Sequence, residues 1–225
     1  GNVAMYALTG KWGITDWRGS QLMTEDGVKA VPTYHPAAIL RQWSWRASAI
    51  ADLRRAARES ESRTYSKPQW YFTIRPSFSQ ASVKLSLLLA DLVQGPKTLS
   101  FDLETRHSHI ACAGIAWSEV EALCIPFMDS SNRDGYWSEP EEISLIDALR
   151  RVLTHVNARV IGQNLLYDAQ YTWRWWHFVP RVTQDTMISH HTAFCELPKA
   201  LDFQASLYCH NYVFWKNEGK TWHEK

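Results

Sequence analysis

The chain has 225 residues, which is enough for one large domain or two modest domains with separate hydrophobic cores. Hydrophobic residues make up 45% of the sequence and charged residues 21%, the balance of an ordinary globular protein. The formal net charge is only +1, and no stretch approaches the length of about 18 apolar residues that a membrane-spanning helix needs, so the sequence predicts no membrane span.

The four cysteines show no C-x-x-C spacing of the kind found in redox motifs and zinc sites. Cys112 and Cys124 fall within apolar runs, where a free cysteine behaves as a small hydrophobic residue. We therefore expect free thiols in a reducing compartment, and a cytoplasmic protein without a signal peptide.

The N-terminal part of the chain is predicted to contain short helices and strands. A helix over residues 1–9 should end at Gly10, because glycine readily adopts the left-handed conformation that stops a helix. The other elements predicted here are strands over 19–23 and 28–34, a helical turn opened by Pro36, and a helix over 44–62. Ile50 and Leu53 form the apolar side of that last helix.

Positive charge is concentrated in residues 41–67, which carry seven basic and three acidic side chains and include Trp43 and Trp45. Basic side chains interleaved with aromatic ones can follow a phosphate backbone. A solvated amphipathic helix has the same composition, and the charge alone favours this second interpretation.

Residues 63–69 are polar and lack periodicity, which is typical of a linker. The sequence then predicts helices over 79–93, 139–156, 165–177, 185–194 and 201–208, and strands over 70–74, 98–104, 110–117, 121–127 and 159–162. Three strands in succession are joined by short turns and should pair antiparallel, and helices and strands alternate after them. This order predicts an α/β fold with a mixed β-sheet flanked by helices.

The sequence TLSFDLETRHSHIACAGIAW (98–117) places two carboxylates one residue apart in a predicted strand. Asp102 and Glu104 alternate with Phe101 and Leu103, so both acids point to one face of the strand. Two like charges on one face repel each other unless a cation lies between them. The pair is either half of a metal site or a strand end in water, and this motif alone does not separate the two.

A further carboxylate follows a buried strand in VIGQNLLYDAQY (160–171). Asn164 and Asp168 are four residues apart at the start of a predicted helix and share one face of it. Asn164 could simply cap the helix, and Asp168 could face solvent. The neighbouring residues are so apolar, however, that Asp168 is expected to need a partner.

Together these motifs resemble a known family. FDLET, QNLLYD about sixty residues later, and DTM at 185–187 are similar to the 3′–5′ proofreading exonuclease domain of family-A DNA polymerases, a DEDD-type member of the RNase H-like superfamily. The stretch ELPKALDFQASLYCHNYVFWKNEGK (196–220) resembles the phage branch of these polymerases. The resemblance covers roughly residues 95–220 and implies an RNase H-like mixed sheet flanked by helices.

By this resemblance Asp102, Glu104 and Asp168 would be catalytic metal ligands. They would bind two Mg²⁺ or Mn²⁺ ions, because hard divalent cations prefer carboxylate oxygens. Such a pair of ions activates a water and stabilises the leaving 3′ oxygen of DNA. Three further residues would line the terminal nucleotide: Thr105, Gln163 and Asn164. Asp185 is predicted to be a helix N-cap rather than a metal ligand.

The sequence departs from this family at the third motif, which should be Tyr-x-x-x-Asp, or His with Asp five residues later. After Asp168 only Asp185 and Asp202 remain, and neither is preceded by Tyr or His at the required spacing. The expectation is that the motif follows Lys225, so that these residues alone are one carboxylate and one tyrosine short.

The N-terminal part resembles a different family. GNVAMYALTG, ITDWRGSQL and VPTYHPAAILRQW are similar to the C-terminal half of uracil-DNA glycosylases of the superfamily that includes the iron–sulfur type. In that family a histidine hydrogen-bonds a uracil carbonyl oxygen while the base is flipped out. These roles would fall to His35, to Ile39 or Leu40 as an apolar wedge, and to Arg41 near a phosphate. The water-activating motif and cluster cysteines would precede Gly1, so this part alone is not expected to excise uracil.

The two resemblances together imply a partial glycosylase-like α/β unit over 1–62, a linker over 63–69, and an exonuclease domain over 70–225 that ends before its third motif. The expected partners are the 3′ end of single-stranded DNA and the remaining polymerase domain of the parent protein, with no membrane. The expected location is the cytoplasm, which is the host cytoplasm if a phage encodes the chain. Two alternatives stay open: a non-catalytic DNA-binding or interaction module, and a uracil-DNA glycosylase at full length.

Overall fold

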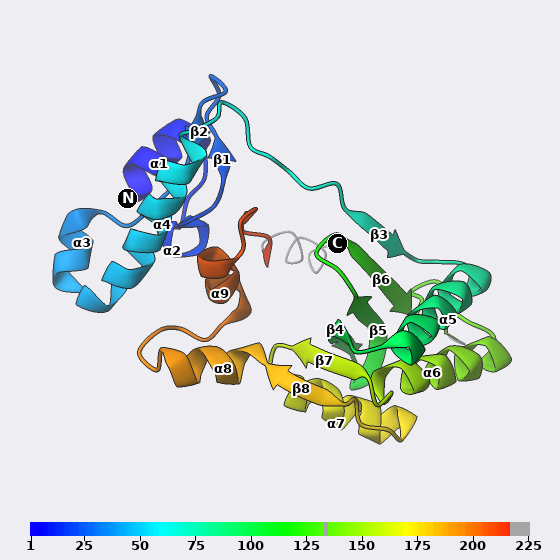
Figure 1. Cartoon of the computed structure of the whole chain (residues 1–225). Coiled ribbons are helices and arrows are strands. Elements are labelled where there is room, and N and C mark those ends of the chain that lie inside the picture. The colour runs from blue at the N-terminus through cyan, green and yellow to red at the C-terminus, as the bar shows by residue number, and fades with distance from the viewer. Residues whose placement is uncertain (133–134, 217–225) are drawn as a thin grey trace. The chain divides into compact units, whose positions relative to one another are not determined.

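The computed structural model of the chain describes residues 1–132 and 135–216. Within it the chain forms two compact units (Figure 1). Unit 1 consists of Gly1–Lys67 together with the segment that begins at His190, and unit 2 is Pro68–Ser189. Each unit has its own cluster of buried hydrophobic side chains.

Unit 2 is built around a six-stranded sheet with the strand order β3-β6-β5-β4-β7-β8. Its strands are β3 (Tyr71–Ile74), β4 (Lys97–Arg106), β5 (His109–Ala116), β6 (Glu121–Pro126), β7 (Ala158–Gly162) and β8 (Val182–Asp185). Strands β4, β5 and β6 pair antiparallel, whereas β3 is parallel to β6, and β7 is parallel to both β4 and β8. The helices of this unit are α5 (Phe78–Gln94), α6 (Glu139–Leu153), α7 (Leu165–Trp176) and the first turn of α8 (Thr186–Ala193). The prediction of an α/β fold with a mixed sheet flanked by helices is confirmed.

Strand β4 has one buried and one exposed face. Leu99, Phe101 and Leu103 are at most 5% exposed, whereas Asp102 and Glu104 lie on the other face and reach solvent. Helices α5 and α6 lie side by side in Figure 1 and contribute their leucines to the same core as the buried residues of β4. The alternation of β4 therefore directs both acids away from the core of the unit.

Strand β8 is an element that the sequence analysis does not predict. Val182–Asp185 pairs with β7 at the edge of the sheet, and the helix expected from residue 185 begins at Thr186. Three of its four residues are exposed, so it has none of the hydrophobic alternation by which a half-buried strand is recognised.

Unit 1 contains short elements around a small core. They are α1 (Asn2–Thr9), α2 (Ile14–Trp17), β1 (Leu22–Met23), β2 (Lys29–Ala30), α3 (Pro36–Arg41), a 3-10 turn η1 (Trp43–Trp45), α4 (Arg46–Glu59) and α9 (Leu201–Tyr208). Gly10 adopts a φ of 66° and ends α1 as predicted. The buried core of this unit is formed by Met5, Trp17, Leu22, Tyr212 and Phe214. Among the described residues of both units, no helix is long and apolar enough to cross a bilayer.

Helix α4 turns a different face inward from the one predicted. Ile50 and Leu53 are 41% and 61% exposed, while Asp52 and Arg55 are almost completely buried. The apolar side formed by Ile50 and Leu53 is therefore not the packed side of this helix. Asp52 forms a buried ion pair with Arg18, and Arg55 donates to two backbone carbonyls; the sequence pattern does not reveal such partners in advance.

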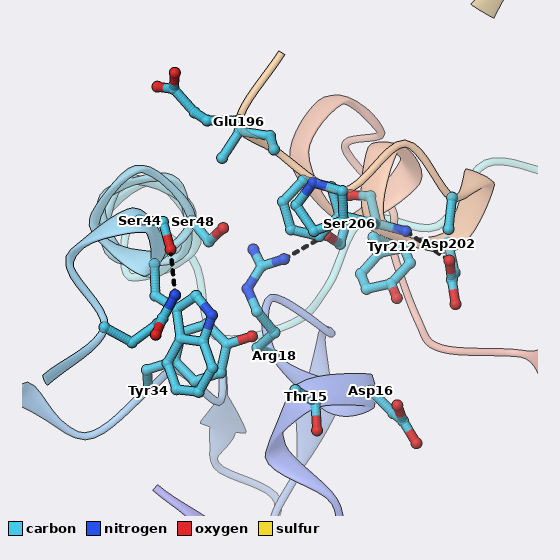
Figure 2. A pocket seen from close by; sticks show the side chains of 16 residues that line it. Thr15, Asp16, Arg18, Tyr34, Ser44, Ser48, Glu196, Asp202, Ser206 and Tyr212 are labelled. Carbon is cyan, nitrogen blue, oxygen red and sulfur yellow. Dashed lines mark hydrogen bonds between the residues drawn. The ribbon is translucent and has the colours of Figure 1, made fainter. Parts of the chain in front are cut away.

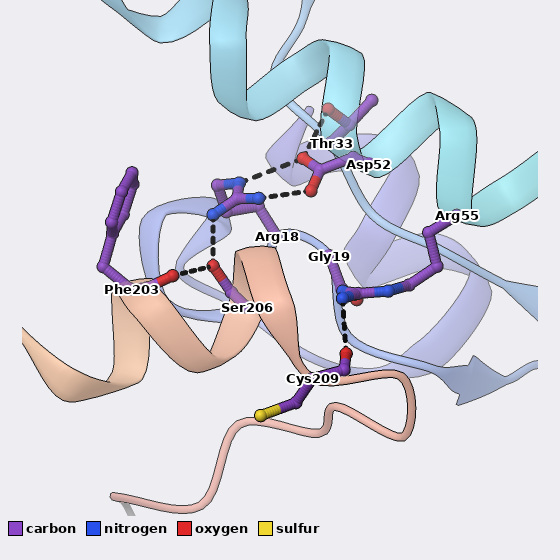
Figure 3. A network of polar contacts seen from close by, with 8 residues as sticks. All are labelled: Arg18, Gly19, Thr33, Asp52, Arg55, Phe203, Ser206 and Cys209. Atoms are coloured by element: carbon purple, nitrogen blue, oxygen red, sulfur yellow. Dashed lines mark hydrogen bonds and ion pairs between the residues drawn. The ribbon is translucent and has the colours of Figure 1, made fainter. Parts of the chain in front are cut away.

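The buried charges of α4 form a polar network that joins distant parts of unit 1 (Figure 3). Arg18 donates two hydrogen bonds to the Asp52 carboxylate and a third to Ser206 Oγ, at 2.6 Å. Arg55 donates to the Gly19 carbonyl and, at 2.7 Å, to the Cys209 carbonyl. Burial of the Asp52 carboxyl raises its pKa, and the bonds from Arg18 oppose this effect.

Further backbone contacts tie the same two segments together. The Gln21 N–H donates to the Tyr212 carbonyl at 2.8 Å, and the Phe214 N–H donates to Ser20 Oγ at 3.1 Å. The segment from His190 to Lys216 therefore packs with the N-terminal residues. This grouping differs from the predicted division, which assigns every residue after 69 to the exonuclease domain.

Candidate carboxylate site

The two acids of β4 stand next to small side chains on the open face of the sheet. Asp102 is paired with Gly114 and Glu104 with Cys112 on β5. The neighbouring strands β5 and β6 carry Gly114, Cys124 and alanines here, and Asp102 borders a hollow of about 330 Å³ on this face. Nothing bulky on these strands covers the carboxylates, so the face is open to a ligand.

Asp168 comes from α7 and reaches the same point of the sheet. The pairing of β4 with β7 ends at Ser100 and Ile161, and the Leu103 N–H lies beyond it. Asp168 Oδ1 accepts this N–H at 2.7 Å, and its side chain is only 3% exposed. The interpretation of Asp168 as solvent-facing is therefore wrong, and the expectation that it needs a partner is confirmed. Leu103 stands between Asp102 and Glu104, so the bond brings the third carboxylate to the first two.

Helix α7 is held at its first turn by Asp185. Asn164 occupies the N-cap position with a φ of 58°, but its side chain makes no capping hydrogen bond. The two carboxylate oxygens of Asp185 instead accept the N–H groups of Asn164 and Leu165, at 3.1 Å and 2.8 Å. Asp185 also accepts the Met187 N–H at 2.9 Å, which confirms it as the N-cap of α8. The alternative in which the Asn164 side chain caps the helix is wrong.

Gly162, the last residue of β7, allows the end of this strand to approach β4 closely. A Cβ at this position would lie 2.7 Å from the Phe101 carbonyl oxygen and 2.7 Å from Leu165 Cδ2, closer than packed atoms can stand. The start of α7, and with it Asp168, is therefore placed by a contact that only glycine permits.

The pKa values of Asp102 and Asp168 are both raised. Partial burial raises the pKa of Asp102, and the Glu104 charge raises it further. The pKa of Asp168 is raised to about 6, chiefly by burial and further by the charges of Asp102 and Glu104, while the N–H groups of Leu103 and Asp168 oppose the rise. The site is thus a small region of uncompensated negative charge.

The side chains of Asp102, Glu104 and Asp168 provide the oxygen ligands that a hard divalent cation prefers. Carboxylate oxygens are the ligands that Mg²⁺ and Mn²⁺ prefer, and a cation would relieve the repulsion that adds to the effect of burial on the pKa values of Asp102 and Asp168. In the described ranges 1–132 and 135–216, however, no three His, Cys, Asp or Glu side chains stand close enough together to hold one ion. The acids are neighbours but are not gathered as the ligands of a single cation.

Two tyrosines beside the carboxylates are absent from the predicted site. Thr105, one residue after Glu104, lies with its Oγ1 at 2.6 Å from the Tyr167 hydroxyl. The Tyr167 and Tyr171 rings are in contact, with centroids 4.8 Å apart. Their four-residue spacing on one helix is the sequence signal that could have identified them. Gln163, by contrast, is held by Thr186, whose hydroxyl donates to Gln163 Oε1 at 2.5 Å.

The predicted glycosylase-like residues lie on or beside α3 in unit 1. His35 is exposed, and its Nδ1 accepts the Ala37 N–H at 3.1 Å, which makes it the N-cap of this short helix. Leu40 is 77% exposed, Ile39 is half-buried and Arg41 is exposed. His35, Leu40 and Arg41 therefore lie on the surface of unit 1.

Unit 1 does contain a cavity, of about 430 Å³, next to this stretch (Figure 2). The Arg18 guanidinium lies in its wall, and the Tyr34 and Trp45 rings stack beside it with centroids 4.3 Å apart. Three carboxylates border it as well, namely Asp16, Glu196 and Asp202. Arg18 is fully engaged by Asp52 and Ser206, so the cavity combines a stacked aromatic wall with an excess of acidic side chains.

Comparison with known proteins adds a fold similarity at low sequence identity. No protein-family model and no curated protein matches the chain. RNase D from Escherichia coli, an exoribonuclease, is similar at 12% identity and a TM-score of 0.48 over 68% of this chain and 36% of that one. The catalytic core of RRP6 from Trypanosoma brucei is similar at 12% identity and a TM-score of 0.47 over 84% of this chain and 48% of that one. The Nibbler EXO domain from Aedes aegypti is similar at 11% identity and a TM-score of 0.35, over 59% and 62%.

The chain spans less than two thirds of each of these three structures. At such TM-scores the similarity does not assign a function. The functional argument depends on the carboxylates themselves.

Proposed function

We propose that unit 2 carries the metal-binding carboxylates of a 3′–5′ DNA exonuclease domain, of the proofreading type found in family-A DNA polymerases. The observation that supports this most directly is the 2.7 Å hydrogen bond from the Leu103 N–H to Asp168, which seats a buried acid beside Asp102 and Glu104.

In this proposal each residue has a separate task. Asp102, Glu104 and Asp168 would hold two Mg²⁺ or Mn²⁺ ions. The chemistry that such ions supply when bound is activation of a water and stabilisation of the leaving 3′ oxygen. Asp168 is oriented by Leu103, and Asp185 positions Asp168 through the start of α7. Thr105, Gln163 and Asn164 would contact the terminal nucleotide.

The first test is metal binding by residues 1–225, measured by calorimetric titration with Mn²⁺. We expect binding that weakens strongly in Asp102→Ala and in Asp168→Asn. Asp147→Ala is the matched control, because it removes an exposed carboxylate of α6 that lies in an ion pair with Arg150. Equal binding by Asp102→Ala and the native protein would exclude this metal site.

The second test is hydrolysis of 5′-labelled single-stranded DNA with Mg²⁺, by these residues and by protein extended through the predicted third motif. We expect shortening from the 3′ end by the extended protein, slowed about 100-fold or more by Asp102→Ala. An unchanged rate in this variant would show that other residues carry the chemistry.

A non-catalytic DNA-binding role is the second candidate, and the exposure of the basic stretch favours it. Of its seven basic side chains only Arg55 is buried, and the exposed ones are Arg41, Arg46, Arg54, Arg58, Arg63 and Lys67. This candidate predicts DNA binding that falls steeply with salt and no hydrolysis even in the extended protein.

The glycosylase role rests on the N-terminal resemblance, and one feature of His35 is compatible with it. Because its Nδ1 accepts the Ala37 N–H, the neutral ring carries its proton on Nε2, where it can donate to a carbonyl oxygen. Release of uracil from single-stranded DNA by the full-length protein, abolished in His35→Ala, would support this role. Absence of uracil release would remove it.

A further inference from the structure

Three aromatic residues form a row along α7, which we call the α7 aromatic row: Tyr167, Tyr171 and Trp175. Their spacing of four residues places them on one face of the helix. Tyr167 is 40% exposed and Trp175 is 38% exposed, while Tyr171 is half-buried. The row is therefore neither core nor fully solvated.

The hairpin between β4 and β5 holds the two ends of the row. Tyr167 is in hydrogen-bond contact with Thr105, as described above. The Trp175 indole N–H donates to the Ser108 carbonyl at 3.0 Å, and its ring lies 4.1 Å from the His109 ring between centroids. Rings fixed in this way lose little conformational freedom when they bind a ligand.

The row begins at the carboxylate site and leads away from it. Tyr167 immediately precedes Asp168, and its partner Thr105 immediately follows Glu104. With a rise of about 1.5 Å per residue, Tyr171 and Trp175 lie about 6 Å and 12 Å further along α7. Trp175 and His109 also line a hollow of about 320 Å³, together with Ile110 and Phe127.

Positive charge accompanies the far end of the row. The Arg174 guanidinium lies over the Trp175 ring, 5.3 Å from its centroid. The hairpin that contacts the row also carries Arg106 and His107, both exposed. Exposed rings interleaved with cations are the chemistry by which proteins bind single-stranded nucleic acid, through base stacking and phosphate pairing.

We propose that the α7 aromatic row binds the nucleotides that precede the 3′ end of a single-stranded nucleic acid, with bases stacked on Tyr171 and Trp175. The polarity of the strand rests on the proposed function, because that function places the 3′ end at the carboxylates. The stacking itself depends only on the row.

Oligonucleotide binding in EDTA tests the proposal without hydrolysis. The probe is a 5′-labelled eight-nucleotide single strand, oligothymidylate or oligouridylate, followed by fluorescence anisotropy. We expect Tyr171→Ala and Trp175→Ala each to weaken binding by about fivefold or more. Trp173→Ala is the matched control, because Trp173 is a 61% exposed tryptophan of the same helix outside the row.

Three results would overturn the proposal. They are unchanged affinity in both row variants, an equal loss in Trp173→Ala, and a loss confined to variants whose circular dichroism shows unfolding. The last result would mean that the row only packs α7 against the hairpin. Weaker binding of both strands supports a nucleic-acid surface, and a preference for one strand identifies whether DNA or RNA is bound.

A crosslinking experiment on the native protein tests the same contacts without substitutions, so its result does not depend on whether a variant folds. Single strands containing 5-iodouracil are irradiated with the protein, and the crosslinked residue is identified by mass spectrometry. We expect crosslinks at Tyr171 or Trp175. Crosslinks found only at other exposed aromatic residues, such as Trp43 or Trp173, would contradict the proposal.

Different experimental results would refute the nucleic-acid binding by the α7 aromatic row and the proposed exonuclease function. Asp168→Asn should abolish Mn²⁺ binding and hydrolysis but leave oligonucleotide affinity within about twofold, since the row is intact. Normal hydrolysis in Asp168→Asn would refute the proposed function alone, and normal affinity in Trp175→Ala and Tyr171→Ala would refute the row alone.

Discussion

At the scale of single residues, Asp168 carries an electrostatic cost that the fold tolerates. A buried carboxylate without a cationic partner destabilises the folded state when it ionises. Among the described residues, Asp168 has only backbone N–H groups as partners, those of Leu103 and of Asp168 itself, whereas the buried Asp52 has the Arg18 guanidinium. Asp52 is already neutralised by Arg18, whereas Asp168 has no cationic side chain as a partner in the described part of the chain and could bind a metal cation.

The cost should appear as a pH dependence of stability in the absence of metal. The pKa of Asp168 rises from 3.8 to about 6 on folding, so between these values the folded state keeps a proton that the unfolded state has released. The free energy of unfolding should therefore fall as the pH rises from about 4 to about 6, by up to about 3 kcal/mol.

Asp168→Asn should remove the part of the pH dependence that Asp168 contributes, while the raised pKa values of Asp102 and Asp52 leave the remainder. The amide oxygen can still accept the Leu103 N–H, but no charge develops, so the variant should exceed the native protein in stability at pH 8 in EDTA. Urea unfolding at pH 5 and pH 8 measures the effect. Asp147→Asn, an exposed carboxylate, is the control and should follow the native protein. A parallel pH profile for Asp168→Asn would contradict the assignment.

At the scale of elements, the site depends on how closely β7 and α7 approach β4. Two glycines of the sheet differ in this respect. A Cβ on Gly162 would collide with Phe101 and Leu165, whereas a Cβ on Gly114 would have its nearest contact, the Asp102 carbonyl oxygen, at an ordinary 3.7 Å. Only the first glycine is required by packing.

Gly162→Ala should therefore lower the free energy of unfolding by about 1–3 kcal/mol, the usual cost of overpacking, and should also weaken Mn²⁺ binding by displacing α7. Gly114→Ala, on the open face, should change stability by about 0.5 kcal/mol or less. Chemical denaturation and calorimetric titration of both variants make the comparison. Equal stability of the two variants would show that β7 can move away without loss.

At the scale of the whole molecule, the chain passes out of unit 1, forms unit 2 and returns. The return is fixed by Arg18, Asp52 and Ser206 (Figure 3). Removing one partner of a buried pair leaves an uncompensated charge, which costs about 3–5 kcal/mol. Disrupting this network therefore tests whether the two segments of unit 1 fold cooperatively.

Asp52→Ala should lower the amide-exchange protection of residues 18–21 and of residues 206–214 together, because both segments depend on the same network. Hydrogen–deuterium exchange with mass spectrometry measures both segments in one experiment. Ile50→Ala, on the exposed side of the same helix, is the control and should change neither. Loss of protection in residues 18–21 alone would show that the returning segment does not depend on this network.

Much of unit 2 follows from local sequence because its elements are regular. The alternation of β4 predicts which side chains are buried, and the same alternation puts Asp102 and Glu104 on one face. The mixed sheet follows from the order of strands and helices. Strand β8 is not predicted because this exposed edge strand lacks the alternation of hydrophobic and polar residues.

The sequence by itself determined the α/β order of unit 2, the shared face of Asp102 and Glu104, and the role of Asp185 as a helix cap. These depend on residues near one another in the chain, and backbone geometry relates them directly. Only the tertiary structure decided that Asp168 reaches Leu103, that α4 buries Asp52 and Arg55 rather than Ile50 and Leu53, and that the segment after His190 packs with the N-terminus. Each of these depends on a partner that lies 34 to 188 residues away, and no local pattern of hydrophobicity or charge specifies such a partner.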